Sequence, residues 1–185
     1  PLAIRSSSLL EDSMLHPFAG IYASVMLPNV DLDPAERLAQ LVSAVKAVYA
    51  STFFQNAKAY LASADRNPEE EKMAVVVQAV VGRRFGPRFY PHLAGVAHSH
   101  NFYAIHPQRP EDGLAQLVLG FGQLVLEGGS FVRFCPRLPG VMPQVVSPRQ
   151  VVQRSQRQFY ALDLDRGFDP AAVGAGQELH LYDLA

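Results

Sequence analysis

The strongest constraint on the fold is a run of apolar, β-branched residues at positions 73–81. Eight of its nine residues are apolar, Gln78 being the exception, and five are valine. Valine favours extended backbone, and an apolar run without polar alternation is typical of a strand that is covered on both faces. We therefore expect residues 73–81 to form a central strand of a sheet.

A long amphipathic helix is expected to precede this strand. Asp33 can cap the helix, Pro34 suits its first turn, and Glu36 completes a capping box. Residues 51–61 predict a second helical segment that points Phe53, Phe54, Ala57 and Leu61 inward. In the first helix, apolar residues recur at helical spacing and form one stripe: Leu38, Leu41, Val42, Val45, Val48 and Tyr49.

Further elements follow from alternating patterns and turn residues. Strands are expected at 20–27, 131–134, 159–164 and 179–184, a strand, glycine turn and short helix at 117–125, another short helix at 148–154, and a solvated hairpin loop at 82–88. The pattern predicts an α+β fold whose sheet is mixed or mainly antiparallel, with helices packed on one side.

The opening stretch carries the most distinctive polar chemistry. Arg5 follows a short apolar run, and three serines and then Glu11 and Asp12 come after it. A guanidinium offers a rigid fork of donors that suits phosphate oxygens, and residues 6–8 add hydroxyl and backbone donors beside it. The alternative is a serine-rich turn in which Arg5 pairs with Glu11 or Asp12.

The segments Ile-Arg-Ser-Ser-Ser at 4–8, Glu-Asp at 11–12 and Phe-Ala-Gly at 18–20 resemble the ATP-grasp nucleotide-binding domain of the phosphoenolpyruvate synthase and pyruvate phosphate dikinase family. Further blocks agree in the same order, at 44–51, 73–78, 95–97 and 120–122 with Val125 and Gly128. The resemblance is concentrated in residues 1–135. Residues 133–137 and 155–163 are similar to a bacterial branch of phosphoenolpyruvate/pyruvate-binding domain proteins, so 136–185 is interpreted as a branch-specific extension of one partial ATP-grasp domain spanning 1–185.

This resemblance implies roles for five residues. Arg5 would bind ATP and act in catalysis, and Ser24 would lie near the ATP phosphates. The backbone of Gln78, Ala79 and Val80 would form the hinge beside adenine. From the residues alone, Ser24 is an ordinary half-exposed strand residue, and the 73–81 run is a core strand whatever the function.

The resemblance also implies an activity. The family's ATP-binding domain takes part in transferring a phosphoryl group from ATP to a histidine on a swivelling domain, which then phosphorylates pyruvate; pyruvate and phosphoenolpyruvate would reach the protein through its other domains. The phosphate-clamping lysine lobe would precede Pro1, and the paired acidic Mg²⁺ ligands would follow Ala185. We therefore expect ATP and Mg²⁺ as cofactors, metal ligands outside this chain, and no catalysis by the chain alone.

Composition excludes several classes of partner. A net charge of −1, from 16 basic and 17 acidic residues, gives no basic footprint for nucleic acid or an anionic membrane surface. No segment approaches the ~20 apolar residues that span a bilayer. The single cysteine, Cys135, cannot form an internal disulfide, which fits a cytoplasmic protein.

Other functions remain open at this stage. His98 and His100 share a strand face, but no acidic residue or cysteine stands close by in sequence to complete a metal site. The family's Gly-Leu-Gly-Glu motif has Gln123 in place of the acid, which favours a nucleotide-sensing module without phosphoryl transfer as the alternative function. The apolar pair Phe53 and Phe54, with the arginines at 83–88, suggests a protein-interaction domain as a third interpretation.

Overall fold

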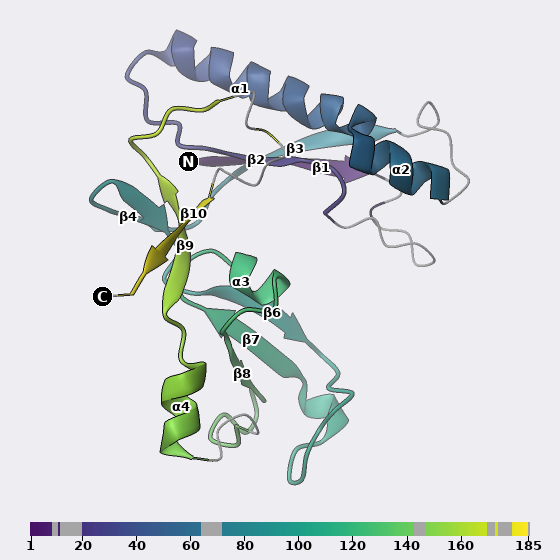
Figure 1. Cartoon of the computed structure of the whole chain (residues 1–185), viewed down its shortest axis with the longest axis vertical. Helices are drawn as coiled ribbons and strands as arrows, with labels where there is room; N and C mark the ends of the chain where they lie inside the picture. The colour runs from purple at the N-terminus through teal and green to yellow at the C-terminus, as the bar shows by residue number, and fades with distance from the viewer. Residues whose placement is uncertain are drawn as a thin grey trace. The chain divides into compact units, whose positions relative to one another are not determined.

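The structure is a computed structural model that describes residues 1–8, 11, 20–63, 72–142, 147–169, 173 and 179–184. These residues form two compact units (Figure 1). The first comprises Pro1–Val80 and Leu162–Leu179, and the second comprises Val81–Ala161 and His180–Ala185. The distinction between a domain core at 1–135 and an extension at 136–185 rests on the family resemblance and stays a prediction.

The first unit contains a three-stranded antiparallel sheet. Its strands are β1 (Leu2–Ser8), β2 (Ser24–Leu27) and β3 (Met73–Ala79), in the order β2-β1-β3. β1 pairs with β2 from Leu2 opposite Leu27 to Arg5 opposite Ser24, and with β3 along its whole length. The strand that carries Arg5 is therefore the central one.

The helices of this unit begin close to where the sequence predicts. α1 spans Pro34–Ala50, and the Asp33 carboxylate accepts a hydrogen bond of 2.9 Å from the backbone N–H of Ala35. A 3₁₀ turn, η1 (Ser51–Phe53), and helix α2 (Gln55–Ser63) follow. The buried Ser51 hydroxyl donates to the Val48 carbonyl and accepts from the Ala23 backbone N–H, so it ties the end of α1 to the start of β2.

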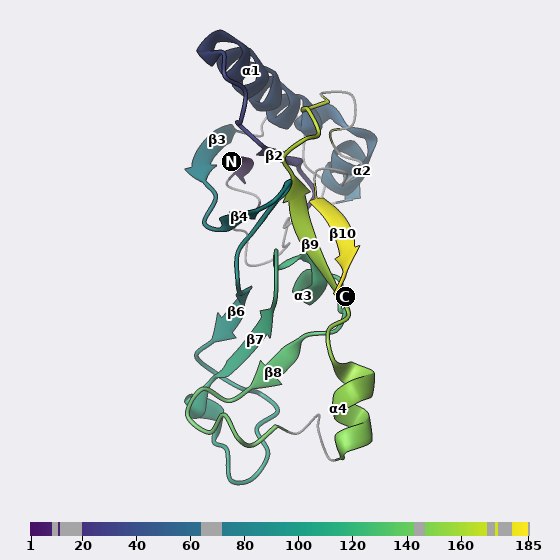
Figure 2. The same ribbon diagram turned by 90° about the vertical axis from the view of Figure 1, so that its left-hand side faces the viewer.

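The core of the first unit lies between α1 and one face of the sheet (Figures 1 and 2). It is built from side chains that alternate along β1 and β2 and from one side of α1, and its fully or almost fully buried members are Ile4, Val25, Leu27, Ala44 and Val48. A second cluster is formed by Tyr22, Ala57 and Leu61. The expected α+β architecture, with helices on one side of an antiparallel sheet, is confirmed here.

The packing differs from expectation at three places. β3 is an edge strand of its sheet, and Val76 and Val77 keep 39% and 46% of their surface exposed, so the strand is not central and not covered on both faces. The apolar stripe of α1 is also wider than its contact with the sheet, since Leu38, Val42 and Tyr49 are exposed. Phe53 and Phe54 likewise remain exposed, whereas Ala57 and Leu61 are buried as expected.

The second unit is built mainly of short strands. Its sheets have the orders β10-β9-β5-β4 and β6-β7-β8 (Figure 2). The elements that lie wholly or mostly in this unit are β4 (Arg83–Phe85), β5 (Arg88–Tyr90), β6 (Ala94–His98), η3 (Pro110–Asp112), β7 (Leu114–Val118), α3 (Gln123–Leu126), β8 (Val132–Phe134), α4 (Pro148–Arg154), β9 (Gln158–Asp163) and β10 (Leu179–Asp183). The strands and short helices predicted from residue 117 onward are thus confirmed to within a few residues.

The predicted hairpin at 82–88 is formed by β4 and β5. Aromatic contacts link it to the rest of its sheet: Phe85 stacks on Tyr90 with 4.5 Å between ring centroids, and Tyr90 contacts Phe159 at 4.8 Å. Arg88 lies over the ring of Tyr182, 4.0 Å from its centroid. At least one hairpin arginine therefore has a structural role, as a cation–π partner.

Candidate functional site

Three of the five predicted site residues lie on one face of the first sheet. Residues directly opposite each other on antiparallel strands share a face, and Arg5 is opposite both Ser24 on β2 and Val76 on β3. Gln78 is opposite Ala3, two residues along β1 from Arg5, and so belongs to the same face. This is the face away from α1, because the core residues Ile4, Val25 and Leu27 occupy the alternate positions. We call it the open face.

Arg5 is exposed on the open face and makes no hydrogen bond or ion pair with any residue that the structure describes. Glu11, one of its two expected partners, is held elsewhere: its carboxylate accepts from the Ser6 hydroxyl at 2.7 Å and from the Ser8 backbone N–H at 2.9 Å. The other expected partner, Asp12, lies outside the described residues. The Arg5 guanidinium therefore keeps its donors for a ligand as far as the structure describes.

The serines after Arg5 divide between two tasks. Ser6 and Ser8 bind Glu11, and the Ser8 hydroxyl also accepts from the Glu11 backbone N–H at 3.2 Å. Ser7, at the alternate position, shares the open face with Arg5 and is exposed. The idea that all three serines offer donors beside Arg5 is thus too broad, because two of them close the turn that follows β1.

The predicted hinge residues have different backbone environments. The Val80 N–H donates to the Pro1 carbonyl at 3.1 Å, which continues the ladder between β1 and β3. In an antiparallel pair, alternate residues direct both backbone groups to the partner strand, so Val80 and Gln78 face β1 and Ala79 faces outward. Among the described residues β3 pairs with β1 alone, so the Ala79 N–H and C=O point away from the other strands of the sheet.

The open face and the β3 edge together offer complementary chemistry. Arg5 supplies positive charge, Ser7 and Ser24 supply hydroxyls, and Ala79 supplies an adjacent backbone donor and acceptor. A guanidinium with hydroxyls suits an anionic tail, and an outward N–H and C=O on one strand suit the hydrogen-bonding edge of a flat heterocycle. Such a surface fits a phosphorylated ligand that also carries a ring.

A sequence model of the pyruvate phosphate dikinase AMP/ATP-binding domain matches residues 1–156 of the 185-residue chain. The chain belongs to this family. No curated protein sequence matches the chain. The match includes every residue predicted for the site, from Arg5 to Val80, and extends beyond residue 135 into α4.

As a member of the dikinase AMP/ATP-binding family, the chain is a nucleotide-binding part of a dikinase-like enzyme, and the family is one of ATP-dependent phosphotransferases. Family membership does not assign roles to single residues. The ATP-binding roles of five residues therefore stay predictions: Arg5, Ser24, Gln78, Ala79 and Val80. Three of these residues share the open face.

The described residues of this domain do not form a metal centre. They contain no group of three or more histidine, cysteine, aspartate or glutamate side chains arranged to hold a metal ion. Glu11 is the one described acid in the turn after β1, and both of its oxygens accept hydrogen bonds from serines. The described donor set of the open face does not fit Mg²⁺, which prefers several oxygen ligands.

Gln123, which the resemblance places where the family has an acid, is part of a small polar cluster. Its side-chain amide donates to the Glu127 carboxylate at 3.0 Å, and the Tyr160 hydroxyl donates to the same carboxylate at 3.0 Å. Burial first, and then the hydrogen bond and negative charge of Glu127, raise the pKa of Tyr160 above its ordinary value. The acid in this part of the second unit is therefore Glu127, one helical turn after Gln123.

Two further sequence interpretations can be compared with the structure. His98 and His100 do not share a strand face as expected, because β6 ends at His98; the His100 ring lies beyond it and contacts Phe102 edge to face at 4.6 Å between centroids. Within the described ranges, no helix is both long and apolar enough to cross a membrane.

Sequence reasoning did not predict that the backbone N–H and C=O of Ala79 point away from β1. A strand's place in its sheet cannot be inferred from the pattern of its own residues.

Proposed function

We propose that the chain is the ATP-binding part of a phosphotransferase that resembles phosphoenolpyruvate synthase and pyruvate phosphate dikinase. Arg5 binds the ATP phosphates, Ser24 lies beside them, and the Ala79 N–H and C=O bind the adenine edge, flanked by Gln78 and Val80. The observation that supports this proposal most strongly is that Arg5 on β1 lies directly opposite Ser24 on β2, on the open face. β1 also pairs with β3, which carries the predicted hinge.

The proposed chemistry is phosphoryl transfer to a histidine on a swivelling domain. The histidine nitrogen forms a bond to a phosphorus atom of ATP while the bond from that phosphorus to its bridging oxygen breaks, and the oxygen leaves with the nucleotide. Arg5 would stabilise the negative charge on the phosphate oxygens during this step. Mg²⁺ would neutralise further charge, and its ligands are proposed to lie outside this chain.

The remaining partners belong to the same proposal. Pyruvate and phosphoenolpyruvate would be handled by other domains of the parent protein, so the chain alone would bind nucleotide without turnover. We propose a cytoplasmic location, since ATP is the substrate and the one cysteine, Cys135, is buried as a free thiol. No role in binding nucleic acid or a membrane is proposed.

The test is isothermal titration of MgATP into the protein that contains this chain together with its natural flanking sequence. Arg5→Ala is expected to weaken ATP binding by roughly ten- to a hundredfold, because charge-assisted hydrogen bonds contribute about 1.5–3 kcal/mol. Lys46→Ala is the matched control, since it removes one positive charge from an exposed position of α1. It is expected to leave the affinity unchanged.

Undiminished ATP affinity in Arg5→Ala, with wild-type stability, would contradict the assignment of Arg5. A separate measurement tests the base contact. Ala79→Pro removes the outward N–H from an edge strand without removing a bond to β1, and is expected to lower ATP affinity more than the affinity for inorganic triphosphate. Equal losses for both ligands would place the base elsewhere.

The alternative function is a nucleotide-sensing module without phosphoryl transfer. It is favoured by Gln123 in place of the usual acid and by the engagement of Gln123 with Glu127. Incubation of the whole protein with ATP labelled in its phosphoryl groups distinguishes the two functions. Label that appears on a histidine supports the phosphotransferase, whereas tight ATP binding without labelled protein supports the sensor.

A further inference from the structure

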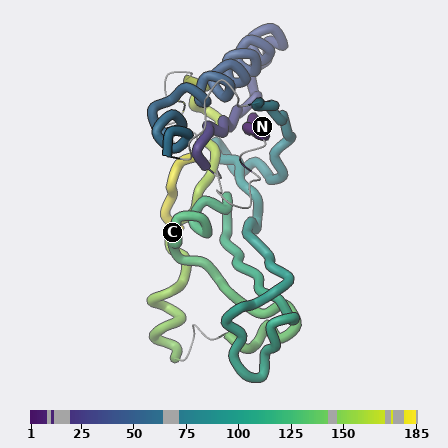
Figure 3. Tube along the Cα trace, turned by 90° about the vertical axis from the view of Figure 1, so that its right-hand side faces the viewer, coloured from purple at the N-terminus to yellow at the C-terminus, as the bar shows by residue number. Residues whose placement is uncertain are grey.

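The second unit contains a pocket of about 90 Å³, which is lined by none of the residues predicted for the ATP site. The chain leaves β6, makes a long excursion over residues 99–113, and returns as β7 (Figure 3). This loop and β8 supply most of the wall. The lining residues are Asn101, Tyr103, Ile105, Gln108, Leu114, Arg133, Phe134 and Cys135.

Two buried amide side chains line this pocket with polar atoms to spare. Asn101 is 3% exposed; its carbonyl oxygen accepts from the Tyr103 backbone N–H at 3.1 Å, and its NH₂ group has no partner among the described residues. Gln108 is 8% exposed and donates from its NH₂ group to the Val141 carbonyl at 2.9 Å, a bond that uses one of its two hydrogens. The Asn101 NH₂ group is therefore a donor that remains available to a small polar ligand.

Arg133 gives the pocket a positive charge. It lies on β8 opposite Gln116, is partly buried, and forms no hydrogen bond or ion pair within the described part of the chain. A guanidinium without a counter-charge offers a fork of donors that suits a carboxylate. The pocket lining therefore combines a positive charge with an amide N–H donor, neither of which has a partner among the described residues.

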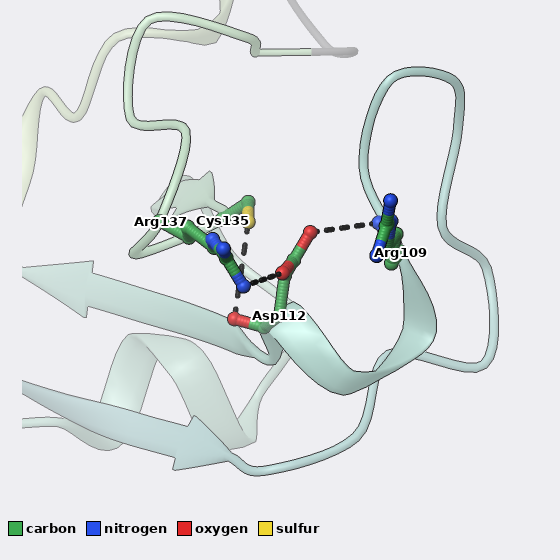
Figure 4. Close-up of polar contacts among 4 residues, drawn as sticks. All are labelled: Arg109, Asp112, Cys135 and Arg137. Atoms are coloured by element: carbon green, nitrogen blue, oxygen red, sulfur yellow. Dashed lines mark hydrogen bonds and ion pairs between the residues drawn. The ribbon is translucent and has the colours of Figure 1, made fainter.

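Asp112, whose backbone contacts the pocket residue Cys135, is already paired with another arginine. Asp112 ends η3, and its carboxylate forms a salt bridge of 3.2 Å with Arg137 and accepts from the Arg109 backbone N–H at 2.8 Å (Figure 4). Its carbonyl oxygen accepts from the Cys135 thiol at 3.9 Å. Asp112 therefore already has Arg137 as its counter-ion, and Arg133 has no acidic partner among the described residues.

We propose that this pocket binds a short monocarboxylate, with Arg133 and the Asn101 NH₂ group on the carboxylate and Ile105 and Leu114 beside an apolar tail. About 90 Å³ corresponds to roughly three water molecules, which limits the ligand to a few non-hydrogen atoms. The apolar walls favour a carboxylate over inorganic phosphate, which has oxygen on every side. All lining residues belong to the second unit, so this inference does not depend on the proposed ATP site.

The experiment uses the ¹⁵N-labelled chain and sodium propionate as the probe. The side-chain NH₂ signals of Asn101 and Gln108 should shift and saturate with a dissociation constant on the order of 1 mM, as expected for so small a ligand. Propionamide, which has the same shape without the charge, should shift them at least tenfold more weakly. Propionamide binding as tightly as propionate would overturn the proposal.

Variants test the residues. Arg133→Gln should weaken propionate binding at least tenfold, and Arg149→Gln, which removes the same charge from an exposed position of α4, should not change it. Asn101→Asp keeps the shape of the side chain but replaces the donor with a repelling carboxylate, and it decides the matter if Arg133→Gln does not fold. Undiminished binding in either folded variant, or tighter binding of inorganic phosphate than of propionate, would overturn the assignment.

Discussion

Each unit of the molecule contains an arginine without a described partner, and the two arginines lie in opposite settings. Arg5 is exposed on a sheet face whose reverse side packs against α1, whereas Arg133 is partly buried in a pocket beside Asn101 and Gln108. An arginine on an open strand is separated from the core by the two-residue alternation, so it can be replaced without a cost to folding. A pocket arginine shares its environment with buried polar groups, and its ligand is restricted by size.

The largest expected effect is on the free energy of unfolding. It compares two neighbouring residues of β1, one in the core and one on the open face. Ile4 is fully buried in the core and Arg5 is exposed. Ile4→Ala is expected to lower the free energy of unfolding by about 2–5 kcal/mol through lost packing and a residual cavity. Arg5→Ala should change it by less than about 0.5 kcal/mol. Urea denaturation measures both, and similar losses for the two variants would show that the open face is part of the folding core.

A smaller loss of stability is expected for a substitution in the second unit, at a glycine of β6 that lies close to the backbone of β7. A Cβ added at Gly95 on β6 would overlap the carbonyl oxygen of Gln116 on the paired strand β7. Gly95→Ala should therefore destabilise the protein by roughly 1–3 kcal/mol. At Gly140 an added Cβ meets no atom within 4 Å, so Gly140→Ala should be neutral or slightly stabilising. Equal thermal midpoints for both variants would mean that β6 and β7 separate easily.

The Asp112 cluster provides a third, more modest comparison. The Asp112 side chain is 4% exposed and the Arg137 side chain 74% exposed. Asp112→Ala leaves the Arg109 backbone N–H without its acceptor and is expected to cost about 1–2 kcal/mol. Arg137→Ala removes only an exposed ion pair and should cost about 0–1 kcal/mol. A larger loss for Arg137→Ala in urea unfolding would contradict this ranking.

The smallest effect concerns pH. Because the pKa of Tyr160 is raised in the folded protein, its stabilising contribution is present below the ordinary tyrosine pKa of 10.0 and is lost as pH rises through the higher folded value. The free energy of unfolding should therefore fall less between about pH 8 and about pH 11 in Tyr160→Phe than in the wild type. An identical fall would remove Tyr160 from the groups that titrate with folding.

Local signals in the sequence predicted many elements well. Asp33 and Pro34 placed the start of α1, because capping and the fixed backbone of proline act within one turn. The predictions of a strand at 131–134 and a short helix at 148–154 likewise agree with β8 and α4. Where these signals failed, as for Leu38 and Phe53, the residue had the right helical or apolar pattern but no neighbouring element to cover it.

The predicted site shows the same division. The family resemblance selected Arg5, Ser24 and the segment around Gln78, and strand register then placed their side chains on one face. The outward direction of the Ala79 backbone groups could not be predicted. It depends on β3 pairing, among the described residues, with β1 alone. The carboxylate pocket was also missed, because Asn101 and Arg133 are separated by many residues and neither belongs to a recognisable motif.

The sequence by itself determined the helix starts, the identity of most strands, and the polar residues that follow the first apolar run, because these depend on interactions within a few residues. Only the tertiary structure decided which strand is central, which faces are covered, and which polar groups remain without partners. Those properties depend on what packs beside each element, and pairings such as Arg5 with Ser24 or Leu2 with Ala79 join residues that are distant along the chain.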